Sequence, residues 1–181
     1  MNNIKQVSRC FRLLFQACFI ILPFLTLYGW MHPEGPVILL NHSIVLDFIP
    51  HGYPITHPIS ATTKIIGFFI SLIPTSISLL ILYFLIKLFR LYEQAIIFSL
   101  QNVKTIRNIG YALLCSEIID PIYQALISIL MTWSNRPGHL TIAISFSGVN
   151  IAMVLVAILT ILISWIMAEG YRLQEEQQYT I

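Results

Sequence analysis

The chain has 181 residues, of which 57% are hydrophobic and only 10% are charged, and its formal net charge is +2. Globular domains usually carry about 25% charged residues, so this composition excludes an ordinary soluble domain and indicates a single membrane domain. The basic residues are spread along the chain, which argues against direct nucleic-acid binding. The three cysteines lie in or beside apolar runs, which favours apolar packing over a disulfide framework.

The N-terminal part of the chain predicts the first of four membrane spans. After a short basic segment, an uncharged run continues to Met31. A helix needs about 20 apolar residues to cross a bilayer core, and no small-x-small cleavage site follows this run. We therefore interpret residues 12–31 as a retained spanning helix, not as a signal peptide, with a kink at Pro23.

Residues 32–64 form the longest segment between predicted spans. Proline and glycine turn signals separate two stretches rich in strand formers, at 37–40 and 44–48. We expect a small loop here that contains short β-strands and no spanning helix.

Further apolar runs predict spans at 65–89, 109–133 and 141–168, of which the last is uncharged throughout and the first is uncharged up to residue 86. Residues 91–108 mix polar residues with apolar ones at helical spacing, and Ser99 can cap a helix, which predicts a break there and an amphipathic re-entry. The last run ends abruptly in the polar tail 169–181, with Trp165 as an anchor near the boundary. The predicted fold class is an all-α membrane protein, a four-transmembrane-helix bundle with a small extracytoplasmic loop.

The distribution of charge predicts the orientation. Four spans place both termini on one side of the membrane. Eight of the ten basic residues fall in the termini or in the loop after the second span: Lys5, Arg9, Arg12, Lys87, Arg90, Lys104, Arg107 and Arg172. The opposite face holds Lys64 and Arg136, so the positive-inside rule predicts that both termini are cytoplasmic.

Glu117 and Asp120 are unusual because both lie inside a predicted span. They share one helix face, and ionisable groups at such depth cost about 3 kcal/mol and normally face the bundle interior. We expect Asp120 to point inward, toward Asn150 or residues 76–78. The intramembrane polar candidates are Glu117, Asp120, Asn150, Ser76 and Ser78. Packing through interhelical hydrogen bonds is the favoured interpretation, and a proton-linked or ligand site is the alternative.

No catalytic motif is evident in the sequence. It has no Walker loop, CxxC pair, HExxH or GxSxG and no nucleophile–base arrangement. No two of the five histidines have close helical or strand spacing, so solvated loop histidines are favoured over a metal or proton-sensing site. We therefore expect no enzyme, no cofactor and no metal site.

Two segments on the predicted cytoplasmic side resemble a known family. Residues 98–110 read FSLQNVKTIRNIG, and the tail from residue 168 reads AEGYRLQEEQQYTI. They resemble the patterns FSxxNVxxLRxIG and EGxxLxEExxLTI of the YoaS-like bacterial membrane family, domain of unknown function 2975. Asn150 fits an Asn near the start of that family's last helix, whereas Tyr179 departs from the usual Leu. Glu117 and Asp120 are not part of the pattern.

The resemblance implies a protein of the bacterial cytoplasmic (inner) membrane without assigned activity. Members are often encoded beside a small helix-turn-helix regulator, which implies such a regulator as a partner. The two motif segments supply the candidates for a cytoplasmic contact surface: Ser99, Asn102, Arg107, Gly110, Glu169, Gly170, Leu173 and Glu175. We also expect the tail to form a short helix packed on residues 98–110, with Leu173 in contact and Glu169, Glu175 or Glu176 paired with Lys104 or Arg107.

These observations favour a non-enzymatic regulator or sensor with a cytoplasmic contact surface, embedded in the lipid bilayer. The alternative function is a small transporter or proton-linked carrier that uses Glu117 and Asp120. A homo-oligomer is compatible with either function.

Overall fold

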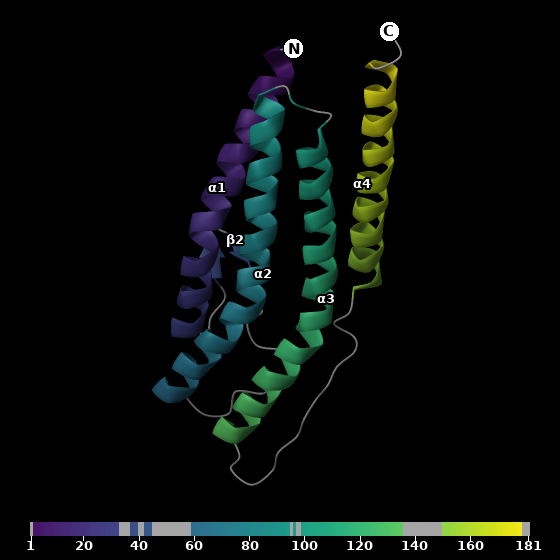
Figure 1. Cartoon of the computed structure of the whole chain (residues 1–181). Helices are drawn as coiled ribbons and strands as arrows, with labels where there is room; N and C mark the ends of the chain where they lie inside the picture. The colour runs from purple at the N-terminus through teal and green to yellow at the C-terminus, as the bar shows by residue number, and fades with distance from the viewer. Residues whose placement is uncertain are drawn as a thin grey trace. The chain divides into compact units, whose positions relative to one another are not determined.

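Four long helices make up most of the chain (Figure 1). The computed structural model describes residues 2–32, 37–39, 42–44, 59–94, 96, 99–135 and 150–178. The helices are α1 (Asn2–Met31), α2 (Ala61–Glu93), α3 (Leu100–Asn135) and α4 (Ile151–Gln178). Each is long and apolar enough to cross a membrane, as predicted for the four spans. At about 1.5 Å per residue, helices of 28 to 36 residues exceed a bilayer core of about 30 Å, so each continues past its apolar part.

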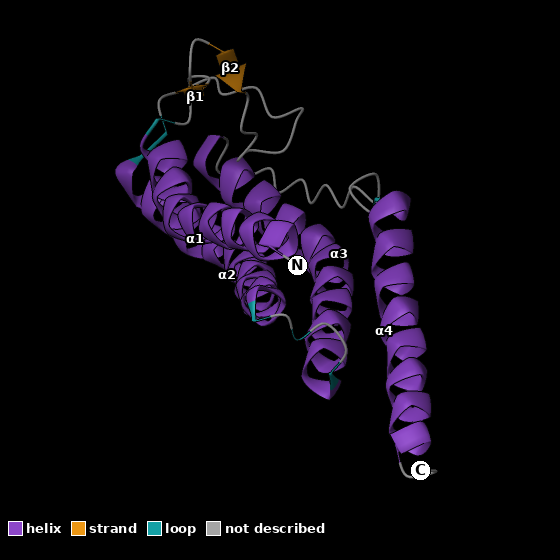
Figure 2. Ribbon diagram, turned by 90° about the horizontal axis from the view of Figure 1, so that it is seen from above, coloured by secondary structure: helices purple, strands orange, loops and turns teal. Residues whose placement is uncertain are grey.

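Two short strands lie between α1 and α2. Strand β1 (Val37–Leu39) pairs antiparallel with β2 (His42–Ile44), with Val37 opposite Ile44 and Leu39 opposite His42 (Figure 2). β1 lies within the first predicted stretch of strand formers. β2 begins two residues before the second stretch, whose residues 45–48 lie outside the described part of the chain.

The boundaries of two elements differ from the predicted ones. α4 begins at Ile151, whereas the sequence predicted a span from residue 141, and residues 136–149 lie outside the described part. The reason is a cap, because the side-chain oxygen of Asn150 accepts hydrogen bonds from the backbone of Ala152 and Met153 at 3.0 and 3.4 Å. The amphipathic re-entry is not a separate turn but the first part of α3, which runs without interruption from Leu100 to Asn135.

The chain divides into two compact units. Unit 1 comprises residues 1–20, 77–117 and 150–181, and unit 2 comprises residues 21–76 and 118–149. All eight basic residues that were predicted to be cytoplasmic belong to unit 1, and Lys64 and Arg136 belong to unit 2.

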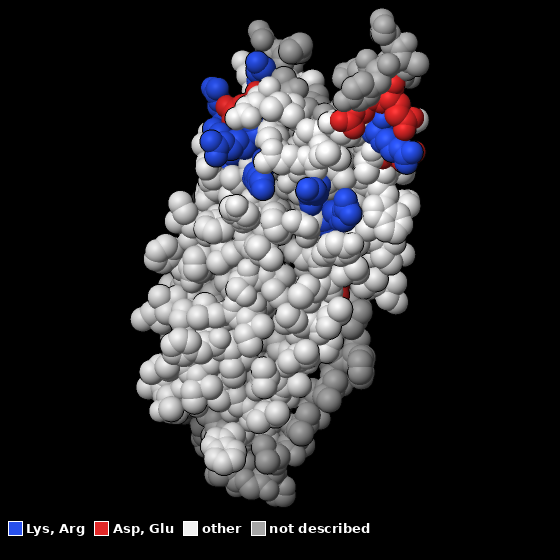
Figure 3. Space-filling view, viewed as in Figure 1, with Lys and Arg blue, Asp and Glu red and all other residues white. Residues whose placement is uncertain are grey.

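The core of unit 1 joins α2, α3 and α4. Leu88 of α2 packs with Ile106 and Ile109 of α3, and Met167 of α4 packs against this cluster. On the α1 side, the ring of Phe89 lies 5.3 Å from that of Phe11. Within this unit the N-terminus of α1, the link between α2 and α3 and the C-terminus of α4 lie at one end (Figure 1). The visible Lys and Arg side chains and the acidic side chains of the α4 tail gather toward that end (Figure 3).

The core of unit 2 is built around Trp30, of which only 2% is exposed. It packs with Ile127 and Met131 of α3 and lies against Gly67 of α2. A Cβ atom at Gly67 would overlap the indole ring, so this glycine allows α2 to approach α1 closely.

Candidate functional site

The connection from α2 to α3 is held by two residues of the segment 98–110. The Ser99 hydroxyl accepts a hydrogen bond from the backbone N–H of Asn102 at 3.2 Å, so Ser99 is the N-cap of α3, as predicted. The fully buried Asn102 side chain in turn donates to the carbonyl of Ile96 at 2.6 Å. This pair of bonds fixes the chain where it turns back into α3.

The next residues of the segment form an internal packing face. Val103, Ile106 and Ile109 are almost fully buried. Gly110 lies where α4 comes closest, because a Cβ atom there would be 2.5 Å from Cγ1 of Ile161 and 3.1 Å from the carbonyl oxygen of Ala157. The segment therefore has a structural role, with Ser99, Asn102 and Gly110 all used inside the protein.

Arg107 differs from its neighbours because it is half-buried and its Nε atom is enclosed. Among the described residues, no hydrogen-bond acceptor reaches that atom. Lys104, one turn earlier, is exposed.

The start of α1 is tied to the end of α2 by ion pairs. Glu93 accepts from Nε of Arg9 at 2.9 Å and from Nη1 of Arg12 at 3.0 Å, and its side chain is only 16% exposed. One carboxylate is thus paired with two guanidinium groups. Basic groups at this end of unit 1 therefore outnumber the Glu93 carboxylate that pairs with them.

Glu117 lies within unit 1 and meets the start of α4. Its carboxylate accepts a hydrogen bond from the backbone N–H of Asn150 at 3.0 Å. The first N–H groups of a helix have no partner within the helix, and a carboxylate there is also favoured by the helix dipole. Glu117 and Asn150 thus form a double cap on α4, in which Asn150 also accepts from Ala152.

Asp120 belongs to unit 2 and makes a bond within its own helix. Its Oδ2 atom accepts from the side-chain amide of Gln124, one turn later, at 2.6 Å. Ser76, predicted to lie near it in the same layer, is exposed and donates to the carbonyl of Ile73 in its own helix. Ser78 belongs to unit 1 and is half-buried. The five polar candidates therefore do not converge on one site within either unit.

The comparisons with known proteins identify the family. A family model described as a protein of unknown function (DUF2975) matches residues 54–181, which is more than half of the chain. The chain belongs to this family. No curated protein and no solved structure matches it.

The DUF2975 match includes the tail, which does not pack as predicted. α4 continues as a helix through Gly170 to Gln178. Leu173 is 52% exposed, and Glu176 pairs with Arg172 one turn back at 3.0 Å. A Cβ atom on Gly170 would meet nothing within 4 Å. The tail therefore extends the α4 helix, and Leu173, which was predicted to pack on residues 98–110, is largely exposed.

A buried polar network in unit 2 was not predicted from the sequence. The indole N–H of Trp30 donates to Ser71 Oγ at 2.8 Å, and Ser71 lies 3.1 Å from the hydroxyl of Tyr123. Thr75 donates to the carbonyl of Ser71, and its Oγ1 lies 3.4 Å from that of Thr26. The available signal was the one-turn spacing of Ser71 and Thr75, which places both hydroxyls on one face of an apolar helix.

Within the described residues, no group of three or more His, Cys, Asp or Glu side chains could hold a metal ion. Three of the histidines, at 51, 57 and 139, lie outside that part of the chain.

Proposed function

We propose that this DUF2975 protein is a non-enzymatic regulator or sensor of the bacterial cytoplasmic membrane, with the helical tail of α4 as its contact surface for a small cytoplasmic protein. The observation that carries the proposal is the exposure of this tail. Every side chain from Arg172 to Glu176 is exposed, although these residues continue a regular helix.

The composition of the tail suits a protein partner. Glu169, Arg172, Glu175 and Glu176 give it an acidic balance, and Leu173 adds an apolar side chain that is 52% exposed. An amphipathic helix of this kind can lay an apolar anchor on a partner while charges set the orientation. A small regulator with a basic face, such as the helix-turn-helix protein that the family resemblance implies, fits this chemistry.

The proposed orientation rests on charge and on the arrangement of unit 1. Both chain termini belong to unit 1, as do eight of the ten basic residues. The positive-inside rule then supports a cytoplasmic location for the N-terminus, the α2–α3 connection and the tail.

The carrier alternative loses its main support. Glu117 caps α4 through Asn150, and Asp120 binds Gln124 in its own helix, so a structural role accounts for each carboxylate.

In-cell crosslinking tests the proposal. A photoreactive amino acid at Leu173 is compared with one at Ile158, which lies on the same helix and is similarly exposed but within the apolar part of α4. We expect a protein adduct from Leu173, none from Ile158, and loss of the adduct when Glu175→Lys is added at unchanged abundance. Mass spectrometry of the adduct identifies the partner.

Two outcomes would contradict the proposal. Leu173 could yield no protein adduct in cells that produce the full chain at normal levels. It could also yield an internal crosslink to residues 98–110, which would mean that the tail is docked and not available to a partner.

A further inference from the structure

The end of unit 1 that carries the basic residues has a cavity of about 380 Å³ between α2 and α3. Its lining combines hydrogen-bond donors with apolar side chains and comprises Tyr83, Ile86, Lys87, Arg90, Leu91, Gln94 and Gln101. This volume lies at the lower end of the range of about 300–1,000 Å³ that is usual for small-ligand sites.

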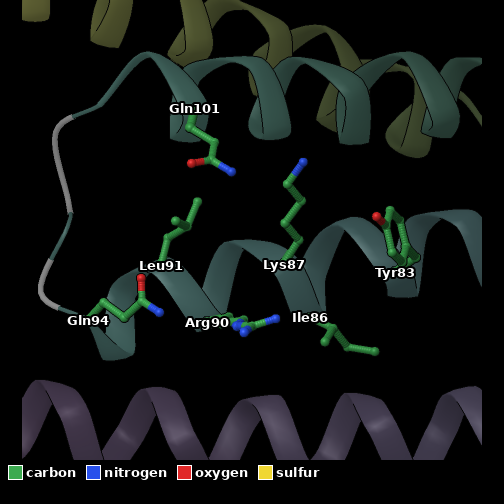
Figure 4. Close-up of a pocket in the computed structure, with 7 residues that line it drawn as sticks. All are labelled: Tyr83, Ile86, Lys87, Arg90, Leu91, Gln94 and Gln101. Atoms are coloured by element: carbon green, nitrogen blue, oxygen red, sulfur yellow. The ribbon is translucent and has the colours of Figure 1, made fainter.

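Side chains from both α2 and α3 point into this cavity (Figure 4). Lys87 and Gln101 extend toward each other across the space between the two helices, and Tyr83 and Leu91 rise from the same side of α2 as Lys87 (Figure 4). Lys87 and Tyr83 are about one helical turn apart, as are Lys87 and Leu91, so all three share one face of α2. Gln94 lies at the end of α2, near the link to α3 (Figure 4).

The charge of this cavity is positive. No carboxylate lines it, and among the described residues Lys87 forms no ion pair, whereas Arg90 interacts with the charge of Glu93. The nearest acidic residue along α2, Glu93, is already engaged by Arg9 and Arg12. The half-buried Lys87, beside two amides and a phenol, favours an anion with several acceptor oxygens.

The position of the cavity along α2 favours one class of anion over others. Lys87 is the first charged residue after the apolar run of α2, so the cavity lies where the helix leaves the hydrocarbon layer. Its apolar side chains, Ile86 and Leu91, suit the glycerol and upper acyl part of a lipid. Basic pockets between membrane helices on the cytoplasmic side commonly bind anionic headgroups. We propose that this cavity binds the phosphate headgroup of an anionic phospholipid, with Lys87 and Gln101 as its main donors.

Native mass spectrometry of the full detergent-solubilised chain tests this proposal. Phosphatidylglycerol and phosphatidylcholine with identical acyl chains are offered at equal concentration, and the ratio of the two bound lipids is measured. We expect the wild-type chain to retain phosphatidylglycerol preferentially, and Lys87→Gln to lower the ratio about tenfold, because it removes a charge-assisted hydrogen bond.

Two further variants separate a site from a general basic surface. Lys104→Gln removes the same charge from an exposed position on α3 outside the cavity, and should change the ratio by no more than about twofold, since exposed charges are screened. Gln101→Leu keeps the charge and removes a cavity amide that can donate to the phosphate, so it should lower the amount of bound phosphatidylglycerol by about threefold to tenfold. If Lys87→Gln does not fold, Gln101→Leu carries the test, because Gln101 is exposed and not part of the core.

Three results would overturn the proposal. An equal effect of Lys104→Gln and Lys87→Gln would mean that the basic end attracts lipids without a site. An unchanged amount of bound phosphatidylglycerol in Gln101→Leu would exclude the cavity. Full displacement of phosphatidylglycerol by inorganic phosphate, with no preference between the two lipids in its presence, would assign the site to a water-soluble phosphate compound. None of these measurements involves the tail, so they stand apart from the crosslinking at Leu173.

Discussion

Two glycines of the DUF2975 segments allow a matched test of how α3 packs on α4. Both lie inside helices of unit 1, but their surroundings differ. A Cβ atom on Gly110 would lie 2.5 Å from Ile161 Cγ1 and within 3.2 Å of backbone atoms of α4, whereas one on Gly170 would meet nothing within 4 Å. Gly110→Ala should therefore destabilise the protein, and Gly170→Ala should not.

The size of the effect follows from two terms. Replacing glycine by alanine inside a helix lowers the free energy of the folded state by about 1 kcal/mol, and this gain is common to both positions. Overpacking costs about 1–3 kcal/mol, and it applies only at Gly110, where backbone atoms of α4 have to move. The free energies of unfolding of the two variants should thus differ by about 1–3 kcal/mol, with Gly110→Ala the less stable.

Chemical unfolding of both variants in the same detergent micelles measures this difference. Helix content by circular dichroism before unfolding serves as the check that both start from the native fold. Equal unfolding free energies for Gly110→Ala and Gly170→Ala would refute the close approach of α4 to α3 at this glycine.

Three other predictions concern caps and orientation. Ser99→Ala should lower the unfolding free energy by about 1 kcal/mol in the same assay, whereas Ser99→Asp should retain the wild-type value, since Asp also accepts from Asn102. Glu117→Gln should have the wild-type free energy of unfolding, because an amide oxygen still accepts from Asn150. Glu117→Ala should lower the free energy of unfolding by about 0.5–1.5 kcal/mol. Equal losses in the two variants would show that the charge of Glu117, and not its hydrogen bond to Asn150, is required. Reporter fusions after His57 and after Ile181 should report opposite sides of the membrane, and the same side for both would exclude the proposed topology.

The parts of the fold that were predictable depend on local sequence. Uncharged runs long enough to cross a bilayer predict spanning helices because the membrane excludes unpaired backbone groups. The N-cap at Ser99 was also predictable, since a serine just before an apolar helical pattern can satisfy the backbone of its own next turn. Both signals require no knowledge of tertiary contacts.

The features that sequence reasoning missed depend on partners far along the chain. Trp30 closes the first apolar run and is buried only because Gly67 leaves room for its ring and Ser71 accepts its N–H. The bound of α4 at Ile151 was not predicted because the run from residue 141 carries no charge, while the backbone N–H of Asn150 donates to Glu117, which lies 33 residues away along the chain. The depth of an acidic residue in a predicted span indicates that its position is unusual. It does not identify the group that donates a hydrogen bond to the carboxylate.

The two family segments of this DUF2975 protein have opposite physical roles. In the first, Ser99, Asn102 and Gly110 are engaged by the chain's own backbone and by α4, so changes there should act through folding. In the second, Leu173 and Glu175 are exposed on the last turns of α4, so changes there should leave stability nearly unaltered. On the proposed function, changes at Leu173 and Glu175 should weaken contact with the partner while the abundance of the protein stays normal. The tail is therefore the segment in which loss of function at normal abundance would point directly to the partner.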